Sequence, residues 1–122
     1  MMTRADFRTL FLRALNAAAD SAEAKLAEPV PRLFRVELHG AGCAGSIISV
    51  DEAINRLYLA DDRFFRIVDL AVTQVLSDET VVFARVSGHA PGPFANTYDP
   101  SDLGPFKQIA AEHVIDRRVP TG

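Results

Sequence analysis

The sequence predicts an α+β domain: one mostly antiparallel sheet with a long N-terminal helix, a second short helix and a long ordered loop rich in proline and glycine. Three observations indicate this class. Apolar residues recur at three- and four-residue steps through residues 1–28. Apolar and polar residues alternate over 32–39, as in a half-buried strand. Two further strand-like segments, 63–76 and 80–89, are separated by the turn residues 77–79.

Composition predicts a single domain. The 122 residues are 48% hydrophobic and 24% charged, close to globular averages, so we expect one unit over 1–122: the helix in 1–28, the sheet core with the short helix in 32–89, and the loop in 90–105. Charges interrupt every apolar run before the ~18 residues that a membrane helix needs. Residues 1–13 lack the apolar core of a secretion signal. We therefore expect a cytoplasmic protein that does not bind membranes.

The N-terminal helix has a defined start and stop. Thr3 is a suitable N-cap, and Pro29 and Pro31 are expected to end the helix near Glu28. The apolar stripe comprises Phe7, Leu10, Phe11, Ala14, Leu15, Ala18, Ala22 and Leu26. About 24 residues at 1.5 Å each make a rod of roughly 36 Å. This is longer than a small domain needs, so we expect part of the stripe to contact a second subunit.

The middle of the chain alternates strands with a short helix. Residues 40–45 form a glycine-rich turn after the first strand, and 46–50 favour a second, short strand. Ser49 and Glu52 have capping-box spacing, which predicts a short helix that starts near Val50 and ends by Asp61.

The two strands near 63–76 and 80–89 are expected to form a hairpin that is apolar on both faces. One face carries Ile67, Ala71, Thr73, Val75, Val82, Ala84 and Val86, and the other carries Val68, Leu70, Val72, Leu76, Val81 and Phe83. A solvated antiparallel sheet alternates apolar with polar residues. We therefore expect helices on both sides, or a partner on one.

The segment 88–105 holds four of the seven prolines and three of the seven glycines, so it is neither a helix nor a central strand. Phe94, Tyr98 and Leu103 predict that this loop is ordered and packed. Residues 106–117 have helical spacing, although a strand fits them as well.

The glycines at 40, 42 and 45 match the letters of a dinucleotide fingerprint. That motif requires a helix opening at its third glycine, whereas Gly45 leads into a β-branched segment. A hairpin loop with glycines at positive φ is therefore the prediction, and we expect no cofactor.

Cys43, His39 and His89 are the candidate catalytic residues, as a thiol with possible bases. With Asp99 or His113 they also offer ligands that zinc accepts, but without the paired spacing of zinc sites, so no metal is expected. Any pocket should contain the first three, closed by Tyr98 or Asp99, because both glycine-rich exits leave strand ends. Burial of Cys43 as a small side chain is the alternative.

The charge pattern argues against nucleic acid. The net charge is −3 and positive residues are spread evenly along the chain, so the phosphate-neutralising patch of nucleic-acid binders is missing. We expect a non-catalytic protein-interaction module, of the kind that small bacterial immunity or adaptor proteins provide, at least dimeric. The alternative is a small enzyme or ligand-binding domain around Cys43, His39 and His89.

Overall fold

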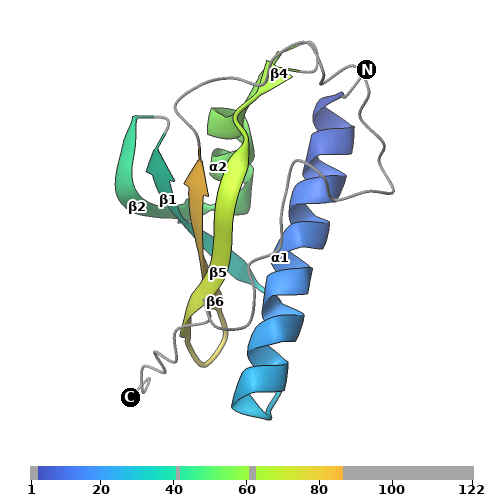
Figure 1. Cartoon of the computed structure of the whole chain (residues 1–122), viewed down its shortest axis with the longest axis vertical. Helices are drawn as coiled ribbons and strands as arrows, with labels where there is room; N and C mark the ends of the chain where they lie inside the picture. Colours follow the sequence, from blue (N-terminus) through green and yellow to red (C-terminus); the bar gives the residue numbers. More distant parts are fainter. Residues whose placement is uncertain (1–2, 41, 61–62, 87–122) are drawn as a thin grey trace.

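Two helices lie against one face of a four-stranded mixed sheet in the computed structural model, which describes residues 3–40, 42–60 and 63–86 (Figure 1). The elements in chain order are α1 (Arg4–Leu26), β1 (Phe34–Gly40), β2 (Cys43–Ser49), α2 (Val50–Leu57), β3 (Tyr58–Ala60), β4 (Arg63–Phe64), β5 (Ile67–Val75) and β6 (Thr80–Val86). The α+β prediction is confirmed. The predicted loop 90–105 and the segment 106–117 lie outside the described residues.

Helix α1 begins at the predicted cap. Thr3 Oγ1 accepts a hydrogen bond from the Asp6 N–H at 3.1 Å, and the Asp6 carboxylate accepts one from the Thr3 N–H. The helix ends at Leu26, before the prolines, because Ala27 turns left-handed and donates its N–H to the Glu23 carbonyl.

The apolar stripe of α1 packs on the chain's own sheet. The stripe residues from Phe7 to Ala22 are at most 2% exposed, in one core with the inner face of the sheet. Our expectation that part of the stripe contacts a second subunit is therefore wrong. The reason is that α1 runs alongside the long strand β5, which gives the rod a surface of matching length (Figure 1).

Two antiparallel hairpins meet at a central parallel pair. The strand order is β2-β1-β6-β5, in which β1 pairs antiparallel with β2, β6 pairs antiparallel with β5, and β1 runs parallel to β6. The start of this parallel pair is fixed by Thr80, which donates its N–H to the Leu33 carbonyl and its hydroxyl to the Pro31 carbonyl at 2.6 Å. Side chains of all four strands that face the helices form the core: Val36, Leu38, Ile48, Ile67, Leu70, Val72, Val75, Val82, Ala84 and Val86.

The predicted faces of the β5–β6 hairpin are partly wrong. The register shifts twice along β5, between Ile67 and Asp69 and between Val72 and Gln74. Each shift inserts one residue and moves the following side chains to the other face. Ala71 therefore does not share a face with Ile67. It lies opposite Phe83 on the face of the sheet away from α1 and α2, called here the helix-free face.

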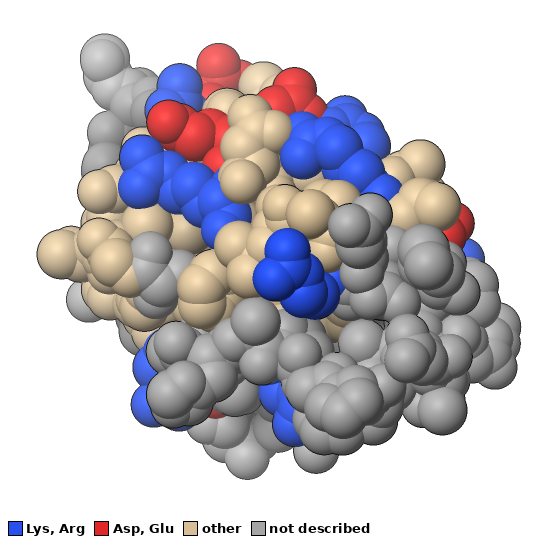
Figure 2. Space-filling view, turned by 90° about the horizontal axis from the view of Figure 1, so that it is seen from above, with Lys and Arg blue, Asp and Glu red and all other residues tan. Residues whose placement is uncertain are grey.

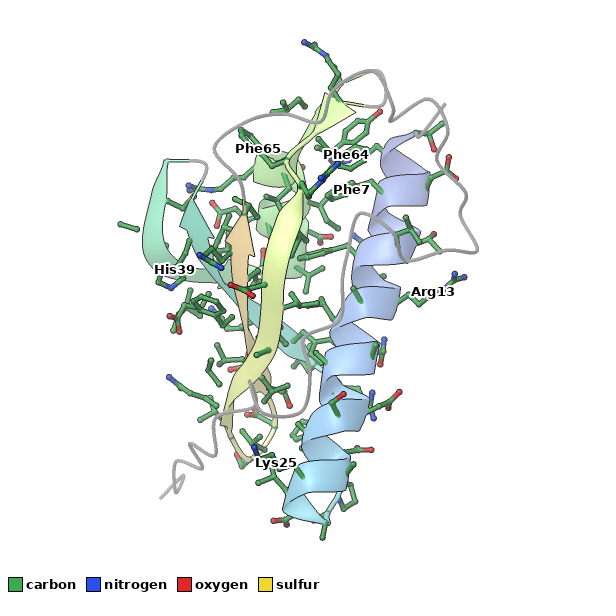
Figure 3. All side chains as sticks on the ribbon, viewed as in Figure 1. Phe7, Arg13, Lys25, His39, Phe64 and Phe65 are labelled. Atoms are coloured by element: carbon green, nitrogen blue, oxygen red, sulfur yellow. The ribbon has the colours of Figure 1, made fainter. Side chains whose placement is uncertain are left out.

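A small second sheet interrupts the predicted strand 63–76. Tyr58, the C-cap of α2, is extended and pairs with Phe64, so α2 stops at Leu57, within the predicted limit at Asp61. Figure 3 shows Phe7 of α1 directed at Phe64, and the ring centroids are 5.4 Å apart. The centroid of the Tyr58 ring lies 5.8 Å from that of Phe7. These aromatic contacts join the N-terminal end of α1 to the second sheet.

The linker between α1 and β1 is tied back to the helix. Arg32 donates to the Asn16 carbonyl at 3.1 Å and to the Asp20 carboxylate at 2.7 Å. Glu23 accepts the Val30 N–H at 2.9 Å, and this bond is the main cause that lowers the pKa of the Glu23 carboxyl below 4.5.

Glu23 is expected to contribute stability that acid removes. Because its pKa is lowered in the folded protein, the contribution is present above the ordinary value of about 4.5 and is lost as the pH falls through the folded value. Glu23→Gln should lower the urea midpoint at pH 7, and the gap to wild type should close toward pH 3. Glu28→Gln, an exposed carboxylate in the same connection, is the control for charge. A gap that is the same at both pH values would contradict the assignment.

Gly40 is expected to be required where β1 meets β6. It has φ +95°, and a Cβ there would lie 2.5 Å from the Val86 carbonyl oxygen. Gly42 has φ +77° with open space around a Cβ, so Gly42→Ala should cost only the left-handed strain of about 1–2 kcal/mol. Gly40→Ala should cost at least about 1 kcal/mol more. Equal losses in urea unfolding would show that the close approach to β6 carries no energy.

Candidate functional site

The glycine-rich segment is a hairpin. Gly40, Gly42 and Gly45 have φ of 95°, 77° and 81°, and strand β2 runs through Gly45 to Ser49. The predicted hairpin and its positive-φ glycines are confirmed, but the turn is shorter than the expected 40–45, because β2 already begins at Cys43. The opening helix that a dinucleotide fingerprint needs does not follow Gly45, because β2 occupies that stretch.

Gly45 is a bulge residue that makes room for His39. Leu38 pairs with Ser46 and His39 pairs with Ala44, so Gly45 is the extra residue on β2. A Cβ at Gly45 would lie 2.7 Å from Cε1 of the imidazole. Because Gly45 has no side chain, the imidazole ring of His39 can approach the strand this closely.

The imidazole of His39 is held on the helix-free face. Its Nε2 lies 2.7 Å from Oε2 of Glu37, and its ring centroid lies 4.7 Å from that of Phe83. Figure 3 shows His39 on the side of the sheet away from α1. Two further ion pairs lie across this face, Arg35 with Glu79 and Arg85 with Asp69.

Because of these ion pairs, the second face of the sheet is less apolar than the sequence predicts. Val81 and Ala71 are buried there, while Phe83 is half-buried among charged neighbours. In the part of the chain that the structure describes, both helices lie on the opposite side. The expectation of helices on both faces is therefore wrong for these residues, and the helix-free face is amphipathic.

Cys43 contacts α2 through Arg56. Arg56 donates from Nη1 to Cys43 Sγ at 3.1 Å, and this bond is the main cause that raises the pKa of Arg56. Arg56 also lies 3.5 Å from the Glu52 carboxylate, one helical turn earlier. The cysteine itself is half-buried and packs against the core.

Sequence reasoning did not find Arg56. The sequence pattern points to histidines as bases for the thiol. An arginine 13 residues along the chain carries no spacing signal of its own. The signal was indirect: because Ser49 caps a helix directly after β2, the chain reverses and the last turn of that helix returns over the start of the strand.

Of the predicted site residues, Cys43 and His39 lie within the described part of the chain. Cys43 is directed toward α2 and His39 toward the opposite face, so the structure does not bring these two together. His89, Tyr98 and Asp99 lie outside the described residues, as does His113. The strand ends that lead to both glycine-rich exits do lie side by side, since β1 is parallel to β6 and Gly40 adjoins Val86.

Strand β2 is an edge strand of the four-stranded sheet in the part of the chain that the structure describes. It ends the strand order on one side of the sheet, and it contains neither a charge nor a proline. Its Ile47 is 45% exposed on the helix-free face. An edge strand presents backbone N–H and C=O groups that can pair with an added strand.

Charge and metal chemistry give no competing site within 3–40, 42–60 and 63–86. No group of three His, Cys, Asp or Glu side chains there is arranged to hold a metal ion, and no helix there is long and apolar enough to cross a bilayer. Figure 2 shows basic and acidic side chains interspersed on the end of the molecule that it presents. Arg8 of α1, for example, pairs with Asp51 of α2.

Comparisons with known proteins add no assignment. No protein-family model matches the sequence, and no curated protein or solved structure is significantly similar to it. The function must therefore be argued from the geometry itself.

The Gly45–His39 contact is expected to appear as coupling between the two positions. Gly45→Ala should destabilise the protein by both backbone strain and the collision with the imidazole. In a His39→Ala background only the strain remains, so the two substitutions should couple by about 0.5–3 kcal/mol. Urea unfolding of the two single variants and the double variant measures this energy. Additive losses would show that the ring does not depend on the glycine.

Proposed function

We propose that this protein is a non-catalytic protein-interaction module that binds an extended segment of a partner as an additional strand beside β2. The observation that carries the proposal is an uncharged, proline-free edge strand with an exposed isoleucine. Main-chain hydrogen bonds supply affinity in this mode of binding, and alternate side chains supply specificity.

The contrast with the other edge supports β2 as the binding strand. β5 ends the strand order on the opposite side, but it has two register shifts and the ion-paired Asp69, and α1 packs along it. Irregular pairing, charge and a covering helix are the usual means by which proteins protect sheet edges. β2 also has a bulge, at Gly45, and the end of α2 contacts its first residue, but Ser46–Ser49 pairs regularly with β1.

The contacts of the candidate catalytic residues also favour binding over catalysis. The alternative site around Cys43, His39 and His89 requires the imidazole of His39 to leave Glu37 and Phe83. It also requires the ring to cross from the helix-free face to the side of Cys43. The half-buried free thiol is compatible with a reducing compartment, and we keep the cytoplasm as the proposed location.

A charge placed on the edge is expected to abolish strand addition. The probe is a fluorescent peptide with the β2 sequence and serine in place of its cysteine, titrated to millimolar concentration and followed by polarisation. Wild type should bind it. Ile47→Lys should weaken binding by about tenfold or more, because an edge lysine opposes pairing.

Leu59→Lys is the matched control. Leu59 on β3 is 43% exposed, against 45% for Ile47, but lies off the edge of the four-stranded sheet. Circular dichroism should show both variants folded, since both side chains are exposed. Absence of peptide binding to wild type, or equal weakening by the two lysines, would overturn the proposal.

A further inference from the structure

We infer that the partner on this edge is a second copy of the chain, with β2 paired antiparallel to its own counterpart about a two-fold axis beside Ile47. This inference rests on the proposed function, because it uses the same edge. It names the occupant, the direction of pairing and the register.

The register follows from the faces of β2. A two-fold axis perpendicular to the sheet keeps the helix-free faces of both copies on the same side. Each β2 residue must therefore oppose a residue of the other copy whose side chain points to that same face. Ile47 pairs with Glu37 on the helix-free face, whereas Ser46 and Ile48 pair with Leu38 and Val36 on the core face. With the axis at Ile47, the two isoleucines oppose each other and each Ser46 opposes an Ile48.

This register suits the sizes and exposures of the side chains. Ile47, 45% exposed in one copy, is covered by its counterpart at the ~4.5–5.5 Å Cβ spacing of cross-strand pairs. The small Ser46 is exposed at the edge, and in this register it receives the larger Ile48 of the second copy. The bulge at Gly45 then falls at the end of the paired segment, where it disturbs the ladder least.

Charge favours a second copy as the occupant. A symmetric axis places identical or nearby residues together, so a charged edge strand would repel itself, and β2 has no charge. On the α2 side of β2 the charged residues are complementary: Arg56 contacts Cys43, and Glu52 lies one turn away on the same helix. Because the axis reverses the order of these charges, Arg56 of one copy approaches the Glu52 end of the other.

The test places single cysteines across the proposed axis in the full chain with Cys43→Ser. Ile47→Cys should form a disulfide-linked dimer under mild oxidation, because opposed residues of an antiparallel pair have Cα atoms within disulfide range. Ser46→Cys should cross-link about tenfold less, since the two copies of that residue are diagonal to each other at about 7–8 Å. Leu59→Cys, equally exposed but off the edge, should remain monomeric.

Light scattering of the wild-type protein completes the test. The mass should rise with concentration from 13.3 kDa toward twice that value, and Ile47→Lys should hold it at the monomer. Faster cross-linking of Ser46→Cys than of Ile47→Cys would overturn the register. Wild type that stays monomeric and gives no Ile47→Cys dimer, yet binds the β2 peptide, would overturn self-pairing and leave strand addition standing. Failure of peptide binding as well would remove both.

Discussion

The parallel pairing of β1 with β6 is the constraint on which the rest of this structure depends. Each of these strands already has an antiparallel hairpin partner, so joining them fixes the order of all four strands and sends β2 and β5 to opposite edges. Parallel neighbours need a crossover, and the chain uses the stretch from α2 to β5 for it. The closeness of Gly40 to Val86 and the bonds from Thr80 to the preceding linker mark the two ends of this pair.

The crossover also explains why the sheet has two unlike faces. Helices α1 and α2 share one side and bury the core strands, while the other side is crossed by ion pairs between neighbouring strands. Such exposed pairs contribute little energy individually, on the order of 0–1 kcal/mol. They do keep much of the helix-free face polar.

Local signals in the sequence predicted both helices and the main strands, but neither the small β3–β4 sheet nor the arrangement of the elements. Thr3 and Ser49 marked both helix starts because a cap acts within three residues of itself. The register shifts in β5 depend on the neighbouring strand, so alternation along one strand cannot reveal them. Likewise, the approach of Arg56 to Cys43 requires the path of α2 relative to β2, which is a tertiary property.

The central pair has a consequence for how the chain folds. The pairing of Phe34 with Thr80 joins two residues at nearly opposite ends of the sheet-forming region, so a long loop must close before it forms. Each hairpin, in contrast, closes a turn of only a few residues. Contacts of such long sequence separation form more slowly than local ones, because the intervening chain must first be ordered. Until the two hairpins dock, the inner edges of β1 and β6 are exposed, together with the apolar side chains that both strands bury in the core. Aggregation during refolding therefore competes with the formation of one pair of strands.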